Sequence, residues 1–172
     1  MIKKYLFLLI SMSIISFSCE QKEFSHAKDL EKADINFYCY NFQLKDSSGV
    51  YRDLYRHLSK ANILDFWASW CRPCREAANP EYKKLYKKYH NKGLNIIAVS
   101  SDRHTYYWKK ALKQDSLPWI NLLDSTQRVK NKYNIKSYPT MFLVDSKGKI
   151  VGKNLWGKEL IYKIDSLLKK TE

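Results

Sequence analysis

The chain has 172 residues, which is enough for one globular domain with a real core and too few for two ordinary domains. Hydrophobic residues make up 45% and charged residues 28%, which excludes a disordered chain and a membrane bundle, and four cysteines are too few for a small disulfide-stapled scaffold. The formal net charge of +14 comes from lysines scattered between apolar residues, the pattern of solvated helix faces. Since the chain has no nucleic-acid-binding motif, we predict no nucleic-acid partner.

The N-terminus predicts an export signal. Lys3 and Lys4 precede an uncharged run, Tyr5–Phe17, which is shorter than the roughly 20 apolar residues of a membrane-spanning helix. Cys19 then follows a small residue, and this arrangement resembles a bacterial lipoprotein signal, in which the cysteine is acylated and becomes the new N-terminus. The resemblance implies a lipid anchor at Cys19.

The lipoprotein pattern is loose here, because Ser16 stands where that signal usually has leucine and Phe17 is bulky. A plain export signal with an incidental Cys19 is the alternative. In either case the chain divides into a signal peptide at 1–18, a polar tether at 19–34 and a folded domain at 35–172.

The folded domain alternates strand and helix patterns. Apolar runs predict strands at Phe37–Leu44, Asn62–Trp70, Leu94–Ser100 and Met141–Asp145, and a hairpin partner for the last at Lys149–Asn154. Helical spacing predicts helices at Cys71–His90, His104–Lys113, Thr126–Tyr133 and around Leu160–Leu168, with a short helical turn at Asp53–Leu58. We expect Pro80 to kink the first of these helices. The order of elements predicts an α/β domain of three layers.

The chemistry concentrates in Trp70-Cys71-Arg72-Pro73-Cys74. Two cysteines three residues apart at the start of a helix lie within disulfide reach of each other. The helix N-terminus stabilises the thiolate of the first cysteine, and Arg72 adds a cation nearby. Pro73 suits the first helical turn, where a missing N–H costs nothing. We therefore predict that Cys71 is the nucleophile and Cys74 the resolving thiol of a redox pair.

Other uses of a cysteine pair fit this sequence less well. A structural zinc site usually needs a second pair or a downstream histidine pair, and the four histidines are dispersed, so we predict no metal site. Covalent haem would require a histidine after Cys74, where Arg75 stands. A purely structural disulfide remains open, although so short a loop gives little entropic stabilisation.

The segments NILDFWASWCRPC and SYPTMFLVDSKGKIV together resemble the thioredoxin superfamily, and the arrangement around them resembles its TlpA/ResA-like group of membrane-tethered extracytoplasmic thiol–disulfide oxidoreductases. The resemblance covers about residues 35–170. It implies a thioredoxin-like fold with a central mixed β-sheet flanked by helices, and a cis-proline at Pro139 facing the cysteines. Tyr138 would then offer its backbone to an extended substrate.

The resemblance also implies roles for other residues. Asp65 matches the buried acid of thioredoxins, so we expect desolvation to raise its pKa and Asp65 to shuttle a proton for Cys74. Asp102 is the alternative acid. Cys39 matches no catalytic position, and we predict a buried free thiol in the first strand, with a regulatory or intermolecular disulfide as the alternative. The expected substrate-facing residues are Trp70, Arg72, Pro73, Tyr138 and Pro139.

These features predict an exported, lipid-anchored, periplasmic or envelope-facing enzyme that reduces disulfides of oxidised envelope proteins. Its only redox group would be the Cys71–Cys74 disulfide, without a bound cofactor, and a membrane electron donor would re-reduce it. Apocytochrome thiols in cytochrome c biogenesis are a substrate typical of the family. Two alternatives are a peroxiredoxin-like thiol peroxidase, which the vicinal Cys74 disfavours, and a copper-binding module, which usually has a three-residue spacing between its cysteines.

Overall fold

The computed structural model describes residues 37–169 of the chain. The predicted signal peptide, Cys19 and the tether therefore lie outside the described residues. Seven strands form a single sheet in the order β2-β1-β5-β4-β3-β6-β7. Their bounds are β1 Gln43–Asp46, β2 Tyr51–Asp53, β3 Ala61–Trp67, β4 Leu94–Ser100, β5 Ile120–Leu123, β6 Thr140–Asp145 and β7 Ile150–Lys153.

The sheet is mixed, as the resemblance implies. Strands β3, β4 and β5 are parallel at its centre. Strands β6 and β7 extend it antiparallel on one side, and β1 and β2 extend it antiparallel on the other. The parallel strands need long connections, which helices supply, whereas β6 and β7 are joined by a tight hairpin.

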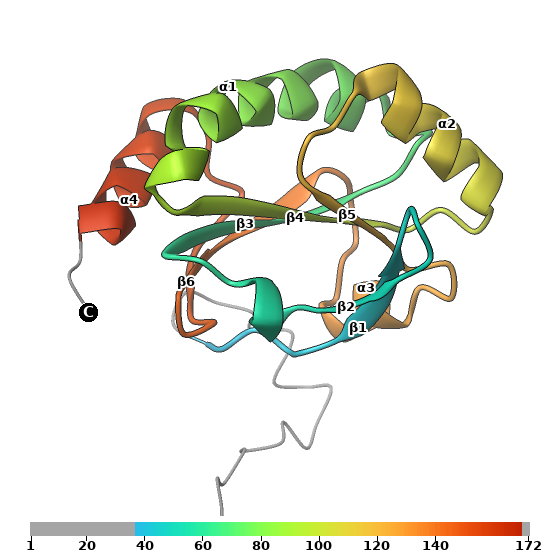
Figure 1. Cartoon of the computed structure of the whole chain (residues 1–172), viewed down its shortest axis with the longest axis horizontal. Coiled ribbons are helices and arrows are strands. Elements are labelled where there is room, and N and C mark those ends of the chain that lie inside the picture. Colours follow the sequence, from blue (N-terminus) through green and yellow to red (C-terminus); the bar gives the residue numbers. More distant parts are fainter. Residues whose placement is uncertain (1–36, 170–172) are drawn as a thin grey trace, which may run out of the picture.

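Helices cover both faces of the sheet (Figure 1), so the three-layer prediction is confirmed. The helices α1 (Asn79–Tyr89), α2 (Thr105–Asp115) and α4 (Gly157–Lys169) pack on one face, and the short α3 (Arg128–Lys132) packs on the other. None of the helices within residues 37–169 is long and apolar enough to span a membrane.

Strand β3 is buried on both faces along its whole length, which explains its nearly continuous apolar sequence. Ile63 and Trp67 point into the core under α1, α2 and α4, whereas Leu64 and Phe66 point into the core on the α3 side. Asp65 is the one charged residue in this strand, and alternation along the strand directs it to the same face as Ile63 and Trp67.

The prediction of an opening strand at Phe37–Leu44 is wrong. Strand β1 begins only at Gln43, and the residues before it make a single isolated bridge, between Tyr38 and Lys149. The segment is apolar because it crosses the α3 face of the sheet and inserts Cys39 and Phe42 into that core. Strand β5, for which the sequence pattern gave no prediction, separates β1 from β4.

The helix that follows the cysteines is not regular. A π-helical turn spans Cys74–Ala78, in which the N–H of Asn79 donates to the carbonyl oxygen of Cys74. Pro80 has no N–H to donate and its ring crowds the preceding turn, so a wider turn directly before it accommodates the proline. The irregularity thus lies before Pro80 rather than at it, and it rotates Ala77 out to solvent while Ala78 is buried.

Cys39 is a buried free thiol, as predicted, although it lies before β1 and not in a strand. Its carbonyl oxygen accepts a hydrogen bond from the hydroxyl of Tyr55 at 2.8 Å, and its N–H donates to Gly148 at 2.7 Å. Burial raises the pKa of Cys39 to about 12, so the thiol is protonated and unreactive at neutral pH.

We expect Cys39 to resist alkylation at pH 8 in the native protein and to react once the protein is unfolded in guanidinium chloride. Cys39→Ala should leave the rate of thiol–disulfide exchange unchanged and lower the free energy of unfolding by about 1 kcal/mol, because it deletes one buried sulfur. Mass spectrometry of iodoacetamide adducts measures the first effect. Rapid alkylation under native conditions would instead favour the regulatory disulfide that is the alternative for this residue.

Candidate active site

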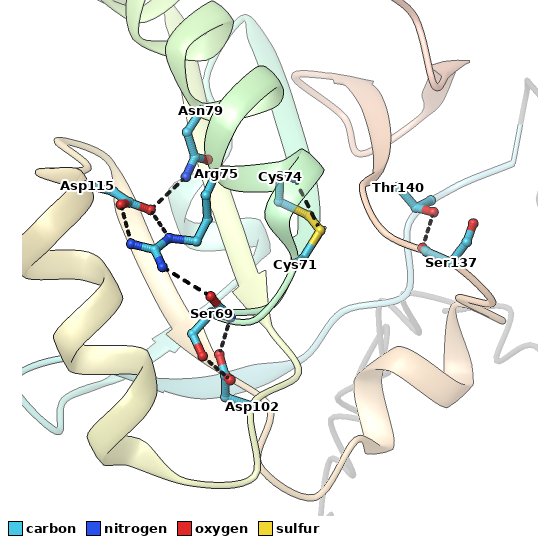
Figure 2. The surroundings of a disulfide bond; sticks show 9 residues. All are labelled: Ser69, Cys71, Cys74, Arg75, Asn79, Asp102, Asp115, Ser137 and Thr140. Carbon is cyan, nitrogen blue, oxygen red and sulfur yellow. Dashed lines mark hydrogen bonds and ion pairs between the residues drawn. A yellow bond between two sulfur atoms is a disulfide. The ribbon is translucent and has the colours of Figure 1, made fainter.

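Cys71 and Cys74 form a disulfide where the loop after β3 enters the helical segment, with their Cα atoms 5.3 Å apart (Figure 2). Cys74 is fully buried and Cys71 keeps 4% of its surface exposed, so an external thiol or disulfide can approach only Cys71. The N–H of Cys74 points at the sulfur of Cys71 at 3.2 Å. After reduction the same N–H and the helix N-terminus would stabilise a thiolate on Cys71.

The loop that carries Cys71 is held by Asp102. This carboxylate accepts hydrogen bonds from the N–H of Ser69 at 2.8 Å, from the hydroxyl of Ser69 at 2.6 Å and from the hydroxyl of Ser100 at 2.6 Å. Both of its oxygens are therefore engaged in fixing the loop after β3 to the loop after β4. This geometry favours a positioning role for Asp102 over the proton transfer considered as an alternative.

A second anchor joins the active-site helix to the end of α2. The guanidinium of Arg75 binds the carboxylate of Asp115 through two hydrogen bonds of 2.8 and 2.7 Å, and it reaches back to the carbonyl oxygen of Ser69 at 3.4 Å. Asn79 donates to the same carboxylate at 3.3 Å. A bidentate arginine–carboxylate pair fixes orientation as well as distance. Nothing in the sequence predicted this network, because Arg75 and Asp115 are 40 residues apart and share no motif.

Arg72 lies exposed between the two cysteines, where a substrate would meet it. Its Nε lies 2.7 Å from a carboxylate oxygen of Glu76, and the two side chains are 83% and 62% exposed. The predicted cation beside Cys71 is therefore paired with an anion one helical turn away. This pairing weakens the field that Arg72 exerts on the cysteine, so the helix N-terminus and the Cys74 N–H are left as the main sources of thiolate stabilisation.

Asp65 is buried beneath the helix that follows the cysteines, on the face of β3 that also packs Cys74 and Tyr82. Its Oδ1 has no hydrogen-bond partner within residues 37–169. Desolvation raises the pKa of Asp65 from 3.8 to about 7. A carboxyl group that titrates near neutral pH can both accept and release a proton under physiological conditions.

Opposite the disulfide, the chain makes the turn that leads into β6. The bond between Tyr138 and Pro139 is cis, as the resemblance implies, and the hydroxyl of Thr140 closes the turn on the carbonyl oxygen of Ser137 at 2.7 Å. Figure 2 shows this turn across the disulfide from Ser69 and Arg75. No main-chain hydrogen bond within residues 37–169 engages Tyr138, which leaves its backbone available to an extended peptide.

Two side chains pack on the ring of Tyr138. The indole of Trp70 meets it edge-on at 5.5 Å between centroids, and the ammonium of Lys130 lies 5.7 Å from its centre. Trp70 is 68% exposed, so it borders the disulfide and does not cover it. This exposure agrees with the expectation that Trp70 faces the substrate. Lys130 carried no signal in the sequence, because only the fold brings α3 close to this turn.

The structure therefore brings Cys71, Cys74, Arg72, Pro73, Trp70, Tyr138 and Pro139 to one end of the sheet, with Asp65 beneath them. A dithiol and a disulfide can interconvert at this place by attack of one thiolate on another sulfur. An exposed aromatic ring and an unpaired backbone segment beside the sulfur can hold an extended polypeptide.

Comparison with known proteins agrees with this geometry. The family model described as thioredoxin-like matches residues 59–150. The chain is 32% identical over 167 residues to the thiol-disulfide oxidoreductase ResA of Bacillus thuringiensis (strain Al Hakam), which covers 97% of this chain and 94% of the relative.

Solved structures give the same result. The thioredoxin domain of a thiol-disulfide oxidoreductase from Bacteroides vulgatus has a TM-score of 0.72 and 31% identity, covering 79% of this chain and 99% of that one. A thiol-disulfide oxidoreductase from Bacteroides fragilis has a TM-score of 0.68 and 32% identity, and the match covers 76% of this chain and 99% of that one. The fold is thus that of proteins named for the exchange chemistry inferred above.

Proposed function

Because this chain belongs to the thioredoxin superfamily, as a TlpA/ResA-like thiol–disulfide oxidoreductase, we propose that it reduces disulfide bonds of proteins in the bacterial cell envelope. The observation that carries this proposal is the Cys71–Cys74 disulfide, with one partly accessible cysteine facing the cis-proline turn and one buried cysteine behind it. Protein substrates follow from the relatives' chemistry. The direction of exchange and the place in the envelope are our own proposals.

The reduced enzyme starts the reaction. The Cys71 thiolate attacks a substrate disulfide, one substrate sulfur leaves as a thiolate, and Cys71 is joined to the substrate in a mixed disulfide. Cys74 then loses its proton and attacks Cys71, which releases the second substrate thiolate and regenerates the Cys71–Cys74 disulfide. Two electrons pass to the substrate, and no bound cofactor is needed because the two sulfurs carry them.

Three further residues support these steps in the proposal. The backbone of Tyr138, held beside the disulfide by the cis bond to Pro139, pairs with the substrate segment around its cysteine. Asp65 accepts the proton of Cys74 in the second step, since its pKa of about 7 leaves it partly ionised at neutral pH.

Anchoring and electron supply complete the proposal. Acylation at Cys19 would hold the domain at a membrane, as the lipoprotein-like signal suggests. An oxidising envelope supplies no reducing pool, so a membrane protein that donates two electrons must restore the dithiol. A tether between the anchor and the domain allows the active site to reach both this donor and the substrates. A disulfide between the cysteines of an apocytochrome, before haem is attached to them, is one substrate that such an enzyme can reduce.

Redox state in the cell tests the direction of exchange. We expect most of the protein to carry free thiols at Cys71 and Cys74 during growth, and to be found with membranes. Rapid acid quenching, thiol labelling with a mass tag and gel separation of membrane and soluble fractions would measure both. Cys19→Ala is the matched variant and should move the protein to the soluble fraction. A protein that is mainly oxidised in growing cells would contradict the proposed direction, and unchanged membrane association of Cys19→Ala would contradict the anchor.

A further inference from the structure

An open cavity of about 690 Å³ lies beside the active-site loop. Ser69 and Trp70, which lead directly to Cys71, form one wall, and Arg103, Tyr107 and Lys110 from the start of α2 and the loop before it form another. In Figure 2 this is the side of the disulfide where Ser69 and Asp102 lie, across from the cis-proline turn. A substrate that pairs with the cis-proline turn can therefore extend past Cys71 into this cavity.

The charges that remain free in the cavity are positive. Asp102 is the only acidic residue in its lining, and this carboxylate is already occupied by three hydrogen bonds from Ser69 and Ser100. Within residues 37–169, the exposed side chains of Arg103 and Lys110 make neither an ion pair nor a hydrogen bond, whereas the side chain of Arg75 is paired with Asp115. The cavity thus offers two unpaired cations to whatever enters it.

The remaining lining suits a polypeptide. Trp70 and Tyr107 are 68% and 57% exposed and give the cavity two aromatic walls, and His104 packs edge-on against Tyr107 at 6.1 Å. A volume of this size accommodates a few side chains. Cations beside aromatic rings select extended segments that carry carboxylates, and they repel segments that carry lysine or arginine.

We propose that this cavity, the basic groove formed by Ser69, Trp70, Arg103, His104, Tyr107 and Lys110, binds an acidic segment that flanks the reacting cysteine of the protein substrate. The proposal rests on the proposed reduction of protein disulfides and adds a preference among substrates. The net charge of +14 attracts any anion to the molecule. The groove predicts more, namely that two particular cations near Cys71 account for most of the preference.

Two peptides test the proposal. Both contain the same intramolecular disulfide, which is flanked by aspartate and glutamate in one peptide and by glutamine and asparagine in the other. The reduced full-length protein should reduce the acidic peptide about tenfold faster at low ionic strength, and added salt should remove the difference. The double variant Arg103→Gln/Lys110→Gln should lose most of this preference and keep its rate with the neutral peptide.

The matched control is Lys87→Gln/Lys158→Gln, which removes the same charge from two exposed lysines away from the groove. It should keep the preference. An equal loss in both double variants, or an unchanged preference in Arg103→Gln/Lys110→Gln, would overturn the proposal. Binding of an acidic peptide without cysteines is measured separately by fluorescence anisotropy. If the acidic peptide binds through Arg103 and Lys110 but neither disulfide peptide is reduced, the groove is supported and the reductive function is contradicted. If there is neither binding nor reduction, the groove and the reductive function are both contradicted.

Discussion

Replacing Cys74 with serine should change this enzyme from a catalyst into a trap for its substrates. Cys71 still forms the mixed disulfide, but the serine hydroxyl cannot attack it, so the adduct persists. We expect multiple-turnover reduction of a protein disulfide to fall by at least about 1000-fold, since residues that act as one catalytic unit cannot replace each other. In cells, Cys74→Ser should accumulate envelope proteins linked to Cys71, visible as bands that disappear with a reducing agent on denaturing gels.

Two variants control this experiment. Cys71→Ser/Cys74→Ser should form no adducts, because the accessible sulfur is missing. Cys39→Ala/Cys74→Ser should form the same adducts as Cys74→Ser, because Cys39 is buried and its pKa is about 12. If adducts form without Cys71, or if none form with it, exchange with proteins through Cys71 is contradicted.

Asp65→Asn should have two large effects, on rate and on stability. Asparagine keeps the shape of the side chain but cannot take the proton of Cys74, so we expect the step that releases the substrate to slow by roughly 100-fold at pH 7. In the wild type, the rate of this step should rise with pH around the Asp65 pKa of about 7. Asp65→Asn should remove that rise. Stopped-flow tryptophan fluorescence of Cys71 mixed disulfides at several pH values measures both.

Asp65→Asn should slow the reaction but stabilise the folded protein. In the folded state the pKa of Asp65 is raised to about 7 from 3.8, so between these pH values the folded protein holds a proton that the unfolded chain has released. The contribution of Asp65 to the free energy of unfolding is therefore most favourable below pH 4. It falls as the pH rises to 7, by on the order of 4 kcal/mol in total. Asp65→Asn has no such loss, and the oxidised variant should unfold at a higher denaturant concentration than the wild type at pH 8.

Tyr82→Phe is the control for Asp65, because Tyr82 is buried close enough for the Asp65 charge to act on it, and its hydroxyl also has no hydrogen-bond partner within residues 37–169. It removes a buried hydroxyl but no group that titrates near neutral pH, since burial raises the pKa of Tyr82 well above its usual value. It should therefore keep the pH dependence of the rate. The role proposed for Asp65 does not survive if Asp65→Asn keeps the wild-type pH profile of the release step, whatever its stability.

Sequence alone determined the features whose causes are local. The two cysteines and Pro73 sit within one turn, so their spacing and the helix start identify the redox pair without knowledge of the fold. Strand β3 could be predicted because burial on both faces requires a continuous apolar run. Asp65 and Pro139 were identified because the motifs around them resemble a known family.

Tertiary structure decided the features that depend on contacts between distant segments. The apolar pattern at 37–44 satisfies a strand and a buried crossing segment equally well, and only the sheet order shows that β1 starts at Gln43. The apolar pattern at 71–90 predicts a helix but does not reveal the π-helical turn before Pro80. A turn with one extra residue is built from the same kinds of residue as an α-helical turn.

The surroundings of the Cys71–Cys74 disulfide were the part of the molecule that the sequence predicted least. Asp115 had no predicted role, and Asp102 was predicted only as an alternative acid for proton transfer. The fold placed Asp102 against Ser69 and Asp115 against Arg75. The basic groove likewise combines the loop before Cys71 with the start of α2. A short motif encodes the reacting sulfurs because chain connectivity alone brings them together, whereas the groove and the anchors exist only after β3 and β4 align in parallel and bring their loops to the same edge of the sheet.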